Sequence, residues 1–191
     1  MAASGSPSDP PVLESPDGTL TVDVSLTEAG QPRYRVRDGD AQVIAPSRLG
    51  FTFEDAPAMR DGFEIMGTDT RTVNTTWVPV WGTEDEITNR FNELTVRLQE
   101  TKAPQRRLTL VFRAYDDGVA FRYRWPRQPN LDSLRIGSED THFRFTDDHT
   151  SWWIPDDYDG YEWRYRQTAL STIVDSAAAL SYNSYLEEDD A

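Results

Sequence analysis

The sequence predicts an all-β fold of antiparallel strands, and three observations carry that prediction. Residues 108–126 (LTLVFRAYDDGVAFRYRWP) have the pattern of two strands joined by a tight turn. Residues 20–45 alternate strands and turns at the short spacing typical of a sandwich or barrel. The chain has 191 residues, of which 37% are hydrophobic and 12% aromatic. That composition supports one large β domain with a packed core.

The hairpin at residues 108–126 is the predicted centre of the core. Apolar side chains recur at every second position on both sides of its turn, as in a half-buried antiparallel pair. They are Leu108, Leu110, Phe112, Ala114, Val119, Phe121, Tyr123 and Trp125. Asp116-Asp117-Gly118 supplies the turn, because glycine tolerates a positive φ and aspartates accept hydrogen bonds from nearby amides. We therefore expect these eight side chains to face the interior.

Four short strands are predicted before this hairpin, separated by turns rich in glycine, proline and aspartate. They cover residues 20–26, 33–37, 41–45 and 49–53. Residues 63–77 have a weaker pattern, although residues 70–77 are β-prone. Proline in the apolar segment Val78-Pro79-Val80-Trp81-Gly82 places that segment at a sheet edge or a bulge.

Residues 83–99 fit two patterns. Ile87, Phe91, Leu94 and Leu98 lie at helical spacing after a Thr83-x-x-Glu86 capping box. Leu94, Val96 and Leu98 also alternate with polar residues, as in a strand. Because the neighbouring segments are strands, we predict a strand over residues 91–99 and leave residues 84–90 open between helix and loop.

Beyond the hairpin, strands are expected at residues 134–139, 141–145 and 151–154, with a turn at Asp147-Asp148-His149. The strand pattern ends near Asp175, and residues 177–186 suit a helical turn. Acidic residues 187–190 are typical of a solvated tail. The predicted domain covers residues 14–175, between a disordered leader (residues 1–13) and a divergent acidic tail (residues 176–191).

Composition limits the partners and the compartment. The net charge of −14 makes nucleic acid an unfavourable partner, because phosphates would repel the chain. Cysteine is absent, which excludes disulfides and thiolate sites and fits cytosol and periplasm equally. No apolar run approaches the ~20 residues that span a bilayer. The first residues, MAASGSPSDPP, lack the basic and apolar regions of a signal peptide.

The residues form no catalytic constellation. Adjacent carboxylates occur at Asp116/Asp117, Glu139/Asp140, Asp147/Asp148 and Asp156/Asp157. Glycosidic cleavage uses two carboxyl groups about 5 to 10 Å apart, whereas neighbours on a strand point to opposite faces. His142 and His149 do not have zinc spacing. The nucleophile-elbow and phosphate-loop motifs are absent, and the acidic loop near Asp159 lacks the spacing of an EF-hand.

The aromatic and acidic segment 152–165 is the best candidate for binding. Flat rings accept the apolar faces of sugars, and carboxylates accept hydrogen bonds from their hydroxyls. The candidate substrate-binding residues are Trp152, Trp153, Tyr158, Tyr161 and Trp163. The alternative is that these rings belong to the core of the sandwich, as strand aromatics usually do.

Five stretches of the chain resemble the N-terminal domain of glycoside hydrolase family 97. They are residues 15–18 (SPDG), 78–82 (VPVWG), 89–93 (NRFNE), 112–123 (FRAYDDGVAFRY) and 152–155 (WWIP), the last with Tyr161-Glu162. The similarity runs from about Val12 to about Asp175, and residues 112–123 are its most specific part.

The resemblance implies a β-supersandwich of the galactose mutarotase-like type, packed in the family against a (β/α)8 barrel with the catalytic carboxylates. It also implies that the full-length enzymes of the family are periplasmic α-glucosidases and α-galactosidases that depend on calcium. One ligand of that calcium would come from a Glu-Ala motif near the end of the N-terminal domain. That motif would follow Asp175, where residues 176–185 read SAAALSYNSY instead. No catalytic or metal residue is therefore carried over, and we expect a sandwich that is incomplete at its C-terminal end.

These observations predict a non-catalytic, carbohydrate-associated domain of a family 97-like enzyme, present without its catalytic barrel. We predict that the chain alone hydrolyses no glycoside and needs no cofactor. We expect calcium only in the full-length enzymes of the family. The expected partners are carbohydrate, bound weakly or through the barrel, and a second copy through an uncovered edge. A free-standing carbohydrate-binding module and a scaffold domain without a sugar site are the alternatives.

Overall fold

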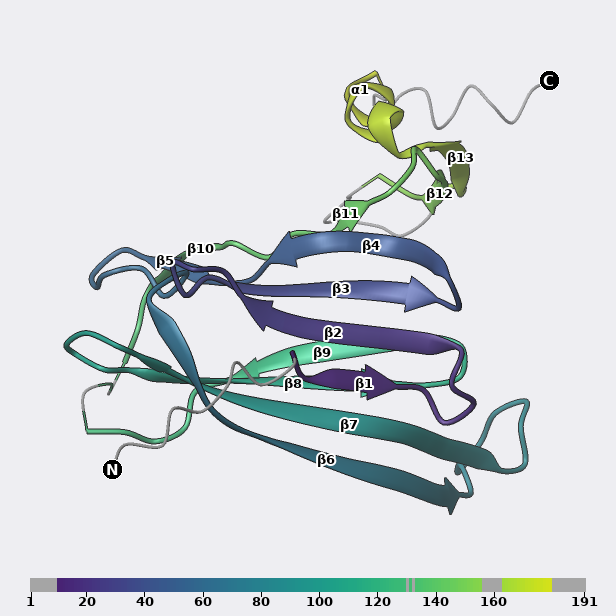
Figure 1. Cartoon of the computed structure of the whole chain (residues 1–191). Helices are drawn as coiled ribbons and strands as arrows, with labels where there is room; N and C mark the ends of the chain where they lie inside the picture. Colours follow the sequence, from purple (N-terminus) through teal and green to yellow (C-terminus); the bar gives the residue numbers. More distant parts are fainter. Residues whose placement is uncertain (1–9, 130, 132, 156–162, 180–191) are drawn as a thin grey trace. The chain divides into compact units, whose positions relative to one another are not determined.

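The computed structural model describes residues 10–129, 131, 133–155 and 163–179. Antiparallel strands dominate it (Figure 1), so the predicted all-β fold is confirmed. The chain divides into two compact units, residues 1–144 and residues 145–191. Within the described ranges, no helix has the length and apolar character needed to cross a membrane.

The first unit contains two larger sheets and one small one. The first sheet has the order β1 (Val12–Glu14), β2 (Leu20–Leu26), β3 (Pro32–Asp38), β4 (Ala41–Arg48) and β11 (Arg144–Phe145). The second has the order β6 (Phe63–Trp77), β7 (Ile87–Glu100), β8 (Arg107–Ala114) and β9 (Val119–Arg124). The third pairs β5 (Phe51–Phe53) with β10 (Ile136–Glu139).

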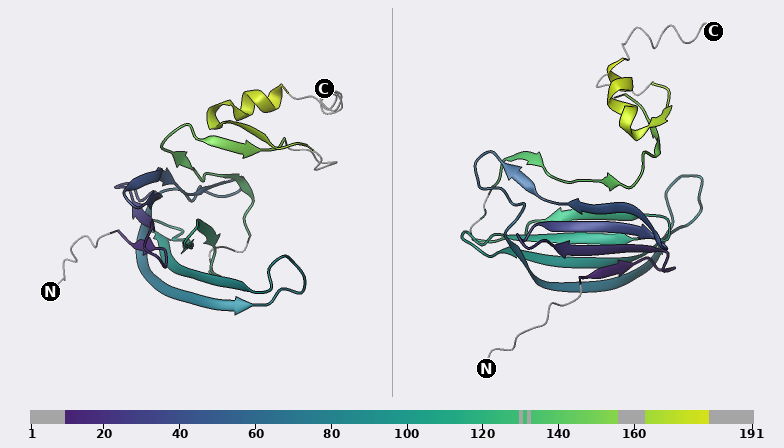
Figure 2. Two further views of the ribbon diagram at one scale, coloured as in Figure 1. Left: turned by 90° about the vertical axis from the view of Figure 1, so that its right-hand side faces the viewer. Right: turned by 45° about the horizontal axis from the view of Figure 1, so that its top comes forward.

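The hydrophobic core lies between the two larger sheets, which face each other in Figures 1 and 2. Tyr34 of β3 and Phe112 of β8 meet there with ring centroids 5.8 Å apart. The Tyr34 hydroxyl donates a hydrogen bond to the carbonyl oxygen of His142 (2.9 Å). Fully buried side chains from both sheets complete the core: Val22, Val24, Leu94, Val96, Leu98, Leu108 and Leu110.

The predicted hairpin is formed by β8 and β9, with Phe112 opposite Phe121. The four predicted interior residues of β8 are fully buried. Those of β9, Val119, Phe121 and Tyr123, are only half-buried, because β9 is an edge strand of the described sheet. In the turn, the Tyr115 amide donates to the Gly118 carbonyl (2.8 Å). Gly118 is not among the glycines with positive φ, so the turn does not use that freedom.

Residues 87–100 form a single strand, β7, and the helical alternative for this segment is wrong. Leu94, Val96 and Leu98 face the core. Phe91 lies on the opposite face, where the Arg113 guanidinium stacks over its ring at 4.3 Å. A strand buried on both faces therefore produced the spacing that resembles a helix.

Residues 78–86 belong to no strand, so the segment predicted at an edge or a bulge is a connection between β6 and β7.

At the other end of β6, Gly30 lies very close to the backbone of Phe63. Its φ is +72°, and a Cβ atom there would lie 2.5 Å from the Phe63 nitrogen. The turn before β3 thus packs directly against the first residue of β6.

The second unit is a hairpin followed by short helices. It contains β12 (Thr150–Trp153), β13 (Arg166–Ala169), the 3-10 helix η1 (Leu170–Thr172) and α1 (Ile173–Ala178). Helix therefore begins before the helical turn expected at residues 177–186, most of which lies outside the described residues. The predicted domain boundaries at residues 13 and 175 stay a prediction.

Candidate functional site

The β12–β13 hairpin holds part of the predicted aromatic site. Trp152 is 67% exposed, while Trp153 is half-buried and its indole N–H donates to Thr168 Oγ1 (3.0 Å). Adjacent residues of a strand point to opposite faces, so these two rings do not form one platform. Trp163 is half-buried before β13, and Tyr158 and Tyr161 lie outside the described residues.

Sequence reasoning left Tyr165 out of the candidate set. Trp152 is paired with Gln167, and Tyr165 lies two residues before Gln167, so Trp152 and Tyr165 share one face of the hairpin. Tyr165 is 72% exposed. Counting at period two from Trp163 would have added this residue to the candidates. An exposed ring pair of this kind has the chemistry to stack on a sugar.

Asp148 fixes the connection between β13 and the short helices. It accepts hydrogen bonds from the Ser171 amide (2.9 Å) and the Ser171 hydroxyl (2.8 Å). The backbone bond and then the hydroxyl bond hold the pKa of Asp148 below its usual range. This carboxylate is therefore engaged in turn structure, in agreement with the turn predicted at Asp147-Asp148-His149.

A second exposed apolar surface lies in the loop between β6 and β7. We call residues 77–82 (WVPVWG) the apolar loop. Val80 is 99% exposed and Trp81 is 88% exposed, and Trp77 and Val78 are exposed as well. Large side chains gathered in an exposed position mark a surface that meets another molecule. The sequence showed this segment as apolar but not that it would leave the sheet.

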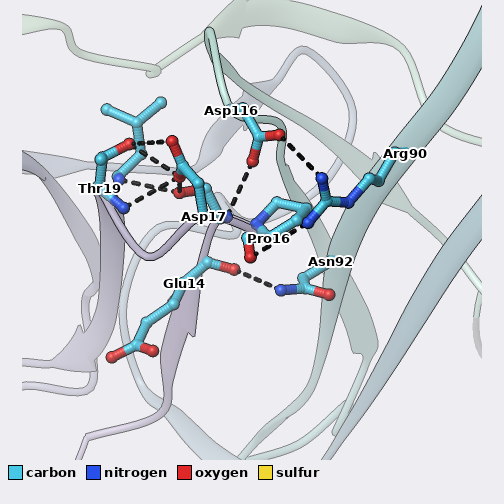
Figure 3. A network of polar contacts seen from close by, with 9 residues as sticks. Glu14, Pro16, Asp17, Thr19, Arg90, Asn92 and Asp116 are labelled. Carbon is cyan, nitrogen blue, oxygen red and sulfur yellow. Dashed lines mark hydrogen bonds and ion pairs between the residues drawn. The ribbon is translucent and has the colours of Figure 1, made fainter.

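A network of polar contacts joins strand β7 and the β8–β9 turn to the turn between β1 and β2 (Figure 3). Arg90 of β7 bonds to the Pro16 carbonyl (3.4 Å) and pairs with Asp116 Oδ2 (3.6 Å). Asp116 Oδ1 accepts from the Asp17 amide (2.9 Å), and Asn92 donates to the Glu14 carbonyl (2.8 Å). Three of the stretches that carry the family resemblance, SPDG, NRFNE and YDDG, meet here. Their shared role is to join the two sheets.

Asp17 is the most strongly bonded carboxylate of the network. Its oxygens accept bonds from the Ser15 hydroxyl (2.5 Å), the Thr19 amide (3.0 Å) and the Thr19 hydroxyl (2.8 Å). The Ser15 bond, followed by those from Thr19, lowers the pKa of Asp17 to about 2. A carboxylate held ionised in this way stabilises a turn and is a poor general acid.

Glu93 of β7 is a buried carboxylate on the outer face of the same sheet. Arg71 Nε lies 2.7 Å from Oε1, and Arg113 Nε lies 2.8 Å from Oε2. The Arg71 bond is the main cause that lowers the pKa of Glu93 to about 2, against the effect of burial. With both oxygens taken by guanidinium groups, Glu93 has a structural role.

The described residues contain no group of three or more His, Asp or Glu side chains placed to hold a metal ion. The calcium that the resemblance implies concerns the full-length family and stays a prediction.

Comparison with known proteins bears on the whole chain. The family model described as glycosyl-hydrolase 97 N-terminal matches residues 13–190. Over 139 residues, the chain is 24% identical to a retaining alpha-galactosidase of Bacteroides thetaiotaomicron, which covers 73% of this chain and 19% of that protein.

Solved structures give a similar result. A variant of a glycoside hydrolase family 97 enzyme from Pseudoalteromonas sp. strain K8, in complex with panose, superposes with a TM-score of 0.78 at 31% identity, over 84% of this chain and 24% of that one. A beta-arabinopyranosidase superposes with a TM-score of 0.70 at 26% identity, over 82% and 26%. The chain thus spans about a fifth to a quarter of the length of these relatives.

Proposed function

The chain belongs to the glycosyl-hydrolase 97 N-terminal family, and on that premise we propose that it is the non-catalytic, carbohydrate-associated domain of a family 97-like enzyme. In this role it packs on the catalytic domain and helps to shape the sugar-binding site. Hydrolysis and sugar binding then depend on the polypeptide that makes up the remaining three quarters of the solved relatives.

The apolar loop is the observation that carries the proposal. Two tryptophans and two valines stand exposed at one end of the sheet, where burial against a partner would remove a large apolar area from water. The loop projects from β6 and β7, and Arg90 of β7 is tied to the other sheet through Pro16 and to the β8–β9 turn through Asp116. A rigid scaffold that presents large side chains is the arrangement of an interface anchor.

A free-standing carbohydrate-binding module is the second candidate. The exposed aromatic residues Trp152 and Tyr165 of the β12–β13 region favour it, since exposed rings can bind a sugar by stacking against its apolar face. The solved relatives that bind panose and acarbose are much longer enzymes, and that difference in length favours the first candidate.

The chain by itself separates the two candidates. We expect sedimentation velocity to show self-association that is lost in a Val80→Ser/Trp81→Ser variant and kept in Trp152→Ala, the matched loss of a ring on the other hairpin. We also expect maltose and galactose to leave the tryptophan fluorescence unchanged, and aryl α-glucoside and α-galactoside to remain intact. Quenching of the tryptophan fluorescence by either sugar, if it disappears in Trp152→Ala, would support the carbohydrate-binding module instead.

A further inference from the structure

The outer face of the four-stranded sheet, the one turned away from the core, collects arginines. Register places Arg71, Glu93, Arg113 and Ala120 in one row across β6 to β9, and Asp69, Thr95, Val111 and Arg122 in the next. Side chains paired in register share a face. The arginines of this face are Arg71, Arg97, Arg107, Arg113, Arg122 and Arg124.

The charge of this face is opposite to that of the chain. Six arginines stand against the three carboxylates Glu64, Asp69 and Glu93, whereas the whole chain has a net charge of −14. A positive surface on an acidic protein creates a local field that attracts anionic groups. The face is therefore distinct from the apolar loop in both position and chemistry.

The arginines differ in how they are neutralised. Arg71 and Arg113 pair with Glu93, and Arg97 pairs with Asp69. Among the described residues, Arg122 and Arg124 of β9 and Arg107 of β8 have no carboxylate partner, and the Arg107 guanidinium donates to the Arg127 carbonyl (3.3 Å). All three side chains are exposed. The unneutralised charge is thus confined to the β8–β9 side of the face.

A small hollow lies among these arginines. Its volume is about 130 Å³, with Val111 and Ala120 between Arg113 and Arg122. Pockets for separate small molecules have roughly 300 to 1,000 Å³, so this hollow has room for one side chain. The aliphatic stem of a glutamate would lie on the exposed Ala120, and its carboxylate would meet the Arg122 guanidinium, which binds such groups with two parallel hydrogen bonds.

We propose that the outer face of β8 and β9 binds an acidic polypeptide segment in extended conformation. Because β9 is an edge strand of the described sheet, an added strand pairs with its backbone and repeats its side chains at period two. Alternate carboxylates of that strand then pair with Arg122 and Arg124. Arg122 and Arg124 are two residues apart on β9, and this spacing matches the alternate side chains of a polypeptide strand. It therefore favours a protein partner over an anionic polysaccharide.

The test uses the 191-residue chain and a fluorescently labelled decapeptide of alternating glutamate and threonine. Anisotropy titrations at about 50 and about 300 mM salt should show binding that weakens with salt. An Arg122→Gln/Arg124→Gln variant should lose at least about tenfold in affinity. Arg48→Gln/Arg60→Gln, the same charge change at exposed positions outside this face, should stay within about twofold. Both variants should keep the parent melting temperature, because these side chains have no ion-pair partner among the described residues.

Three results would overturn the proposal. One is the absence of peptide binding at either salt concentration. Another is an equal loss of affinity in the two double variants, which would show attraction to charge without a site. The third is tighter binding of dextran sulfate than of the peptide, lost in Arg122→Gln/Arg124→Gln, because it would assign the face to an anionic polysaccharide.

Discussion

The β8–β9 hairpin and the β12–β13 hairpin both carry aromatic residues, but their rings occupy different environments. Phe112 of β8 is fully buried and meets Tyr34 from the opposite sheet. Trp152 of β12 is 67% exposed, and β12 pairs only with β13 among the described strands. Aromatic residues in a hairpin therefore do not by themselves indicate burial, which depends on whether a second sheet packs over the hairpin.

The largest effect is expected in the core of the first hairpin. Phe112→Ala should destabilise the protein by about 3–5 kcal/mol, because it removes a fully buried ring that contacts Tyr34 and Phe121. Denaturant unfolding measures this loss. A cost below about 1 kcal/mol would place the ring outside the core and remove the contrast between the hairpins.

Glu93, which pairs with Arg113 of the first hairpin, and Asp148, in the turn before the second hairpin, should also differ in how their contribution to stability depends on pH. The pKa of Glu93 lies at about 2 in the folded protein, against an ordinary value of 4.5. Its stabilising contribution is complete above the unfolded pKa and is lost as the pH falls from about 4.5 toward 2. The loss is on the order of 2–3 kcal/mol.

Unfolding free energies at pH 7, 4.5 and 3 test this contribution. Glu93→Gln should flatten the acid limb of the stability profile relative to the parent protein. Asp148→Asn, in the turn before β12, is the control and should change that limb little, because Asp148 is exposed. Identical acid limbs in the parent and Glu93→Gln would contradict the assigned role of Glu93.

The edge strand of the first hairpin provides an intermediate case. Phe121 lies on the predicted interior face, but it is half-buried, so Phe121→Ala should cost about 1–3 kcal/mol, less than Phe112→Ala. The same denaturant series measures both variants. A larger cost for Phe121→Ala than for Phe112→Ala would reverse the order of burial.

The smallest effect on stability is expected in the second hairpin. Trp152→Ala should change the unfolding free energy by no more than about 0.5 kcal/mol, because most of the side chain is already in water. Thermal or denaturant melts monitored by circular dichroism provide the measurement. A cost near that of Phe112→Ala would mean that this ring is covered in solution.

Local patterns in the sequence were sufficient for much of the fold. Alternation at residues 108–126 predicted the hairpin, its interior face and its central place. It did not show that β9 lies at an edge, because strand order depends on contacts between distant segments. The same limit explains β7, where Phe91 and Leu94 are buried on opposite faces and together imitate a helix.

The candidate site was less accessible to sequence reasoning. The segment 152–165 was chosen for its composition, yet which rings share a face depends on register, and register pairs Trp152 with Gln167 near Tyr165. The apolar loop was visible only as an apolar run broken by Pro79. Its exposure follows from the lengths of β6 and β7, which end at Trp77 and begin at Ile87.

Domain exchange tests the central claim, that this domain docks on a catalytic partner through the apolar loop. Residues 13–190 replace the corresponding domain of the Pseudoalteromonas sp. strain K8 enzyme, with and without Val80→Ser/Trp81→Ser, and hydrolysis of panose, the sugar bound in one of its solved complexes, is measured. We predict an active chimera and a loop variant that is at least about tenfold slower, equivalent to about 1.4 kcal/mol. Equal rates in the two chimeras would contradict docking through the loop.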